Sequence, residues 1–227
     1  MNTIVIKLSG ELFKNNSPDL ISNIVKQIKK LKKDYNIAIV LGAGNILRGN
    51  EHQKKIGIKA TTAHTAGMIA TIINGLIIQD FLEKEKVDAQ LFSAINCPEV
   101  ACVIKQTTID NALSQNKCLI FVGGTGNPFF TTDTNAVLRT LQIGATEMWK
   151  GTKVEGIYST DPLKNKKAKL YKQISYDEVI NQNLKIMDLT AIKLAQENKI
   201  KIKVFNIFEK DALIKASKNK TFGSYIS

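Results

Sequence analysis

Short runs of apolar, β-branched residues alternate along this chain with longer segments in which apolar residues recur every three or four positions. The runs at 3–8 and 37–41 both stop at glycine-containing turns, as buried strands often do. Between them, Pro18 opens a segment with apolar residues at helical spacing and lysines between them. The chain is therefore predicted to begin as strand, helix and strand.

The alternation continues to the carboxyl end. Helices are predicted at 61–82, 106–114, 133–144, 175–181, 188–197 and 211–217, and strands at 87–93, 117–122, 147–150, 201–207 and 224–226. Ser175 and Asp188 are acceptable N-caps for the two helices that they begin. Such alternation predicts a three-layer α/β/α sandwich with a largely parallel central sheet. In these sheets ligands bind beyond the carboxyl ends of the strands.

Composition favours a single domain over residues 1–227, because no composition shift marks a linker. The N-terminus has no basic leader, and the uncharged span 60–79 contains four threonines, His64, Asn74 and Gln79. That polarity favours a buried or interfacial helix over a membrane span. We therefore expect a cytoplasmic protein with no membrane partner.

Charge and reactive side chains narrow the function classes. The net charge is +12, but 30 of the 32 basic residues are lysine, which argues against nucleic acid as the primary partner while still favouring an anionic ligand. Three cysteines without CxxC spacing and only two histidines give little basis for a zinc site, a disulfide framework or a Ser/His/Asp triad.

Three predicted strands end in segments suited to phosphate binding. The first is Lys7-Leu8-Ser9-Gly10-Glu11, where a glycine turn and a lysine can share one anion. The second runs from Gly42 through Gly44 to Arg48, one of two arginines in the chain. The third, residues 123–133, combines glycines, hydroxyls, paired aromatics and Asp133. Neither a P-loop nor a GxGxxG fingerprint is present.

These segments resemble bacterial UMP kinases along essentially the whole chain. The resemblance rests on Lys7 to Glu11, 42–49, 67–76, Thr125 to Asp133, 154–162 and 185–189, in the family's order and approximate spacing. The Thr-Gly-Asn-Pro-Phe-Phe-Thr-Thr-Asp element is highly specific. The resemblance implies the amino-acid kinase fold, transfer of the γ-phosphoryl group from MgATP to UMP, and assembly into homohexamers.

The resemblance also implies roles for matching positions. Lys7, Arg48 and Asp133 are the implied catalytic residues, with Asp133 orienting cations. The implied ATP-binding residues are Lys7, Ser9, Gly10, Gly44, Arg48, Thr152, Tyr158 and Asp161. The implied UMP-binding residues are Gly42, Ala43, His64, Thr125, Gly126, Asn127, Pro128, Phe129, Phe130, Thr131 and Thr132. No protein metal site is expected, since Mg²⁺ is carried by ATP.

Two positions depart from the family pattern. Ala43 replaces the central glycine of the usual Gly-Gly-Gly-Asn, which requires a negative φ at that residue. His64 stands where an acidic ribose ligand is usual, and no Asp or Glu occurs between Glu51 and Asp80. Two alternatives stay open: an acetylglutamate, glutamate or carbamate kinase of the same fold, and a basic RNA-binding or regulatory module.

Overall fold

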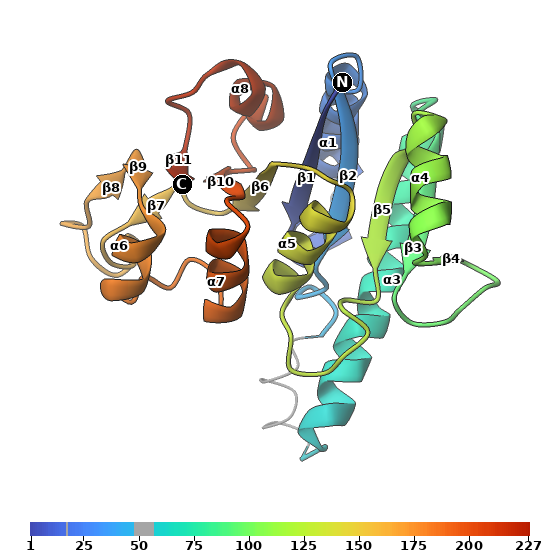
Figure 1. Ribbon diagram of the computed structural model, residues 1–227, viewed down its shortest axis with the longest axis horizontal. Helices are drawn as coiled ribbons and strands as arrows, with labels where there is room; N and C mark the ends of the chain where they lie inside the picture. The colour runs from blue at the N-terminus through green and yellow to red at the C-terminus, as the bar shows by residue number, and fades with distance from the viewer. Residues whose placement is uncertain (17, 48–56) are drawn as a thin grey trace.

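A central sheet of nine strands is formed by the described residues, 1–16, 18–47 and 57–227, of this computed structural model (Figure 1). The strands lie in the order β4-β3-β5-β2-β1-β6-β10-β11-β9. Neighbouring strands are parallel except β10 and β11. Their bounds are β1 Asn2–Leu8, β2 Tyr35–Leu41, β3 Ala89–Ser93, β4 Cys102–Val103, β5 Cys118–Val122, β6 Glu147–Thr152, β9 Gln173–Ile174, β10 Lys201–Asn206 and β11 Ser224–Ile226.

Helices cover both faces of this sheet. They are the 3-10 helix η1 (Gly10–Asn16), α1 (Pro18–Leu31), α3 (Ala60–Lys84), α4 (Gln106–Ser114), α5 (Thr132–Gln142), α6 (Tyr176–Asn181), α7 (Leu189–Glu197) and α8 (Ala212–Lys218). One apolar cluster joins Ile4 and Ile6 to α1, α3 and α8, and a second joins Val5 to α4, α5, α6 and α7. Because side chains alternate along β1, the sheet has a core on each face. The predicted three-layer α/β/α sandwich is confirmed.

The predicted long elements are present, with boundaries shifted by one or two residues. Tyr35 rather than Ile37 begins β2, and β6 continues to Thr152. The predicted caps of α6 and α7 are confirmed, since Ser175 forms a capping box and Asp188 accepts from the backbone N–H of Ala191. The prediction missed β4, β9 and the small antiparallel pair of β7 (Ile157–Tyr158) and β8 (Leu170–Tyr171), because two-residue strands show no periodicity.

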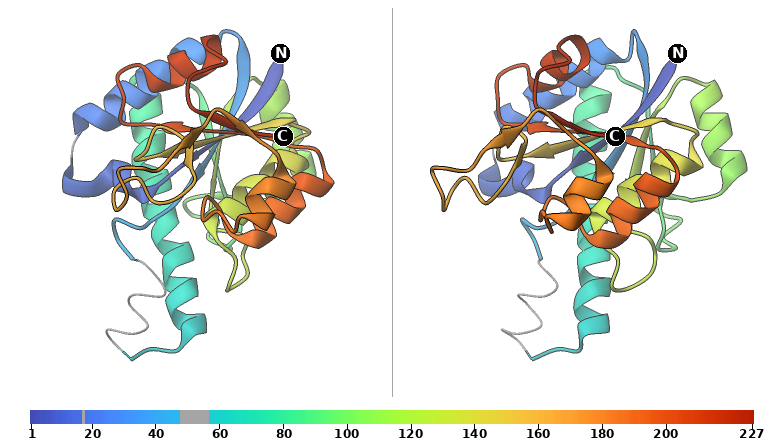
Figure 2. Two further views of the ribbon diagram at one scale, coloured as in Figure 1. Left: turned by 90° about the vertical axis from the view of Figure 1, so that its left-hand side faces the viewer. Right: turned by 60° about the vertical axis from the view of Figure 1, so that its left-hand side comes forward.

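Helix α3 extends well beyond the rest of the molecule (Figure 2). Its side chains Ile69, Ile73, Leu76 and Ile77 are exposed, at 37% to 48% of their full surface. By length and composition it is the one helix of the described chain that could cross a membrane, although 44% of its most apolar window is buried. Core helices of soluble proteins meet the same criterion.

Candidate active site

A buried carboxylate lies between two lysines on the adjacent central strands β1 and β6. Lys7 on β1 and Lys150 on β6 are paired in register, so their side chains leave the same face of the sheet. That face carries α5, whose first turn contains Asp133. The Asp133 carboxylate is 3.0 Å from Lys7 Nζ through Oδ1 and 2.5 Å from Lys150 Nζ through Oδ2. Strand register and helix position together build this cluster.

Burial and charge set the protonation of the cluster. Burial opposes ionisation of Asp133, but the two lysines outweigh it and hold the pKa of this carboxyl down, at about 2. Burial lowers the pKa of Lys150 to about 8; Asp133 opposes this shift and Lys7 adds to it. Two cations thus face one carboxylate, and the cluster retains positive charge at neutral pH. Such a site can bind and neutralise phosphate oxygens.

Asp188 links α5 to the segment that leads into α7. Its carboxylate accepts hydrogen bonds from the Thr131 hydroxyl and, at 2.8 Å, from the Thr134 hydroxyl. The Thr131 hydroxyl in turn accepts from the backbone N–H of Asp133, at 3.1 Å. Nearby, Lys150 Nζ donates to the carbonyl of Ile186 at 2.6 Å. The backbone of Asp133 is thus held through Thr131, and its partner Lys150 is held through the Ile186 carbonyl.

The two N-terminal glycine segments pack against each other beside this cluster. A side chain at Gly10 has no room, because its Cβ would lie 2.5 Å from the backbone nitrogen of Gly44. A Cβ at Gly42 would lie 3.5 Å from both Gly10 N and Thr132 Oγ1. Ala43 is absent from the described residues with positive φ, so the negative φ predicted for it is confirmed. The turns after β1 and β2 and the start of α5 therefore converge.

The loop between β5 and α5 contains the predicted acceptor residues, 125–132. It begins with glycines at positive φ, and Phe129 also has a positive φ, of 72°. The Phe129 and Phe130 side chains are 65% and 48% exposed. The His64 ring on α3 lies 4.9 Å from the Phe129 ring, centroid to centroid. The structure thus places His64 against this loop, as an acceptor-site residue requires.

A cavity of about 600 Å³ is lined by Thr152 at the end of β6 and by Val204 on β10. It brings together Thr152, Tyr158 and Asp161, the three residues predicted to surround the adenine nucleotide. Residues 182–186 complete the wall. This volume matches a small-ligand pocket.

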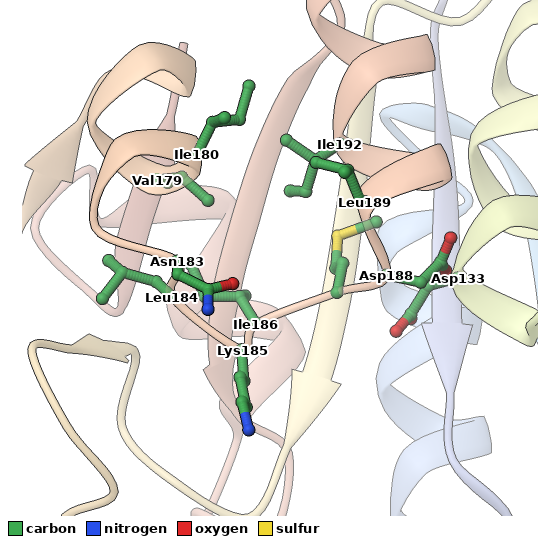
Figure 3. A pocket seen from close by; sticks show the side chains of 11 residues that line it. Asp133, Val179, Ile180, Asn183, Leu184, Lys185, Ile186, Asp188, Leu189 and Ile192 are labelled. Carbon is green, nitrogen blue, oxygen red and sulfur yellow. The ribbon is translucent and has the colours of Figure 1, made fainter.

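A second cavity, of about 400 Å³, lies between α6 and α7 and reaches Asp133 (Figure 3). Its lining is mainly apolar, with Asn183, Lys185 and Asp188 among the polar residues. Residues 183–186 line both cavities and so separate them. The segment before α7 is therefore a wall of the larger cavity as well.

The structure places most of the predicted site residues in four groups: the charge cluster, the converging glycine turns, the loop 125–132 with His64, and the larger cavity. Arg48 lies outside the described residues. The sequence prediction missed Lys150 as a site residue, although a lysine ending a predicted strand was a usable signal. It also missed Asp188, which was predicted only as a helix cap.

Three kinds of comparison relate the chain to known proteins. The model of the amino acid kinase family matches residues 2–206. The uridylate kinase of Mycoplasma genitalium is 42% identical over 96% of this chain and 92% of its own, and that of Mycoplasmopsis pulmonis is 45% identical over 92% and 90%. The crystal structure of UMP kinase from Ureaplasma parvum has a TM-score of 0.94 at 37% identity, covering 100% of this chain and 98% of its own. The chain therefore belongs to the amino acid kinase family, and the full-length relatives named here are uridylate and UMP kinases.

Proposed function

We propose that this protein transfers the γ-phosphoryl group of MgATP to UMP, giving UDP and ADP for pyrimidine nucleotide biosynthesis. The observation that carries the proposal is the Lys7–Asp133–Lys150 cluster. It is bonded on one side to Ile186, which lines a cavity of nucleotide size, and on the other to Thr131 of the aromatic loop 125–132. Near-full-length similarity to uridylate kinases supports it. We propose that residues 1–227 form one domain, with the UMP side mainly N-terminal and the ATP side mainly C-terminal.

In the proposed reaction a phosphate oxygen of UMP attacks the γ-phosphorus, and the bond to the β–γ bridging oxygen breaks to release ADP. A phosphomonoester has a second pKa of ~6, so the nucleophile is largely deprotonated at neutral pH and needs no general base. Catalysis then rests on in-line positioning and on neutralising charge. Lys7, Lys150 and Arg48 supply the charge, and Asp133 orients the lysines.

On the donor side, Ser9, Gly10 and Gly44 hold the ATP phosphates. Gly10 lets the turn after β1 pack against the backbone nitrogen of Gly44, so the two turns meet at one place. Thr152, Tyr158 and Asp161 hold the adenine nucleotide in the cavity they share. Mg²⁺ enters as MgATP and supplies further charge neutralisation on the phosphates.

On the acceptor side, Gly42, Ala43 and His64 bind UMP together with the loop residues Thr125, Gly126, Asn127, Pro128, Phe129, Phe130, Thr131 and Thr132. The two exposed phenylalanines offer stacking surface to a base, and the His64 ring packs against one of them, Phe129. A small acyl phosphate acceptor has no base to stack. This loop is the reason to prefer UMP over acetylglutamate, glutamate or carbamate as the acceptor.

We also propose that the enzyme is a cytoplasmic homohexamer in which α3 packs against α3 of another copy. The exposed residues Ile69, Ile73 and Leu76 recur at helical spacing on α3, and an apolar stripe of this kind suits a protein contact. Light scattering of the native protein and of Ile73→Glu tests the assembly. A native monomer contradicts it.

The test of function is an ADP-release assay with UMP, CMP, dUMP, AMP and acetylglutamate as acceptors. UMP should be phosphorylated at least about a hundredfold better than CMP or AMP, because fixed backbone donors and acceptors reject a wrong base edge. Equal rates with CMP would overturn the UMP assignment, and turnover of acetylglutamate alone would favour the other kinases. Inactivity with every acceptor would favour the RNA-binding alternative.

A further inference from the structure

Two buried polar side chains on α3 contact the turns that follow β2 and β5. Asn74 and Thr71 are both buried, and they lie three positions apart, on one face of the helix. Gly75 lets α3 lie directly on the sheet, because an added Cβ there would lie 2.6 Å from a Val122 methyl group on β5. Polar groups enclosed in this way need hydrogen-bond partners, and Asn74 and Thr71 find theirs in the two turns.

Asn74 holds the turn that follows β2. Its Nδ2 donates to the carbonyl of Gly42 at 2.8 Å and to Asn45 Oδ1 at 2.9 Å, and its Oδ1 accepts from Asn45 Nδ2 at 3.2 Å. Asn45 in turn packs against the turn after β1, since a Cβ at Gly10 would meet Asn45 Oδ1. One amide on α3 therefore fixes the place where the two turns proposed to bind ATP phosphates and UMP meet.

Thr71 holds the start of the acceptor loop. Its hydroxyl accepts from the backbone N–H of Gly123 at 2.7 Å and donates to the carbonyl of Met68, one turn earlier on α3, at 2.7 Å. Gly123 follows the last residue of β5, and its φ of 75° turns the chain out of the strand. Thr71 therefore fixes the point from which the loop 125–132 leaves the sheet.

We propose that Asn74 and Thr71 are positioning residues, Asn74 for the phosphates of the two nucleotides and Thr71 for the acceptor base. This inference rests on the proposed function, which assigns the turns and the loop to ATP and UMP. Each residue acts through the group that it bonds and not by contact with a nucleotide. A misplacement of about 1 Å at reacting groups can cost a hundredfold in rate, whereas a displaced loop weakens mainly the binding of the acceptor.

The two positions should give different kinetic signatures. Asn74→Leu should lower kcat by about tenfold to a hundredfold, because the turn that aligns the phosphates loses its buried bonds. Thr71→Val should raise the KM for UMP about fivefold and change that for ATP less than about twofold. Thr71→Ser keeps the hydroxyl and should restore the native KM for UMP. A merely structural role would lower stability without this split between kcat and KM.

Asn45→Ala gives a milder test of the same link, because it leaves the bond between Asn74 and the Gly42 carbonyl in place. It should lower kcat about threefold, and the double variant with Asn74→Leu should be no slower than Asn74→Leu alone, since both changes break one connection. A double variant slowed by the product of the two single effects would overturn the proposal.

Gln27→Leu is the matched control for Asn74→Leu, because it also replaces a buried amide by an apolar side chain of similar size. Gln27 Oε1 accepts from the backbone N–H of Leu213 at 2.9 Å, a link between α1 and α8. Its loss should lower the urea midpoint of unfolding and leave kcat within about threefold of the native value. Equal losses of kcat in Gln27→Leu and Asn74→Leu would overturn the proposal.

Hydrogen–deuterium exchange of the nucleotide-free protein gives a readout that does not depend on activity. Asn74→Leu should speed amide exchange in the segment 42–47, and Thr71→Val in the segment 123–127, each by about tenfold or more, whereas Gln27→Leu should change neither. Unchanged exchange in these segments would overturn the proposal. If the native protein makes no UDP, the proposed function fails, yet the exchange data still decide whether Asn74 and Thr71 hold the two turns.

Discussion

The charge cluster and the acceptor loop lie next to each other but are built in opposite ways. Lys150 and Asp133 are almost fully enclosed, and each is held by strand register or helix capping together with an ion pair. The loop 125–132 exposes both of its phenylalanines and is held by turns with positive φ at Gly126 and Phe129. A substitution in the cluster therefore alters an ion pair held between two strands and α5, whereas a substitution of an exposed loop residue such as Phe130 alters mainly the surface that the loop presents.

Because of this difference, we expect the cluster to serve phosphoryl transfer and the loop to serve recognition of the acceptor. Phosphoryl transfer needs preorganised charge, which a buried cluster supplies without reorganisation. Recognition of a base needs contact surface that is open before the ligand arrives. Substitutions in the cluster should therefore lower turnover, and substitutions in the loop should alter acceptor affinity and choice.

The largest effect is expected at the cluster. Asp133→Asn, Lys7→Ala and Lys150→Met should each lower kcat by about a hundredfold or more, because each removes charge or orientation from the transferred group. Circular dichroism and kcat measured at saturating MgATP and UMP test this. A folded variant with near-normal kcat would remove that residue from the mechanism.

Lys203→Met is a matched control for Lys150→Met. Lys203 is also buried and lies on β10, next to β6, but its Nζ donates to the carbonyls of Ala216 and Asn219 at 2.5 and 2.9 Å, at the end of α8. Losing it should lower stability and leave kcat within about threefold. A hundredfold loss of kcat in Lys203→Met would show that burial of any lysine, and not the cluster, controls turnover.

The second prediction concerns pH. Burial lowers the pKa of Lys150 to about 8, so free enzyme should lose its cation as pH rises through that value. The kcat/KM for ATP should then fall about tenfold per pH unit above it, whereas bound MgATP should shift the fall in kcat to higher pH. Arginine stays protonated, so Lys150→Arg should flatten the profile. A native profile that stays flat to about pH 9.5 contradicts this prediction.

The fold could be predicted from periodicity because its long elements are amphipathic or fully buried. For example, the apolar runs at 3–8 and 37–41 predict β1 and β2, and the helical spacing after Pro18 predicts α1. The stretch between β6 and α6 could not be predicted in this way, since β7, β8 and β9 have two residues each. The pairing of β9 depends on the distant strand β11, which local sequence does not encode.

The site could be predicted in part, and the missed residues have a common cause. Strand ends with glycine indicated where phosphates bind, and the aromatic loop indicated the acceptor side. Lys150 was missed because its importance comes from register with Lys7, a relation across more than half the chain. Asp188 was recognised as a cap, but its bonds to Thr131 and Thr134 depend on how α5 and α7 pack.

The third prediction separates backbone strain from side-chain contact in the loop. Phe129 has a φ of 72°, which costs a non-glycine residue about 1 kcal/mol, whereas Phe130 is absent from the described residues with positive φ. Phe129→Gly should therefore be about 1 kcal/mol less destabilising than Phe130→Gly in urea unfolding. Both should raise the KM for UMP several-fold and leave that for ATP nearly unchanged. Equal losses of stability would show that the turn stores no strain at Phe129.

The smallest expected effect concerns discrimination between ribose and deoxyribose by His64. A neutral imidazole can accept one hydroxyl proton, whereas a carboxylate can accept two. If His64 contacts the ribose of UMP, His64→Asp should increase the ratio of kcat/KM for UMP to that for dUMP by about threefold to tenfold. Thr65→Asp adds the same charge at the next, exposed position of α3 and should leave the ratio unchanged. An unchanged ratio in His64→Asp would leave His64 with only its packing against Phe129.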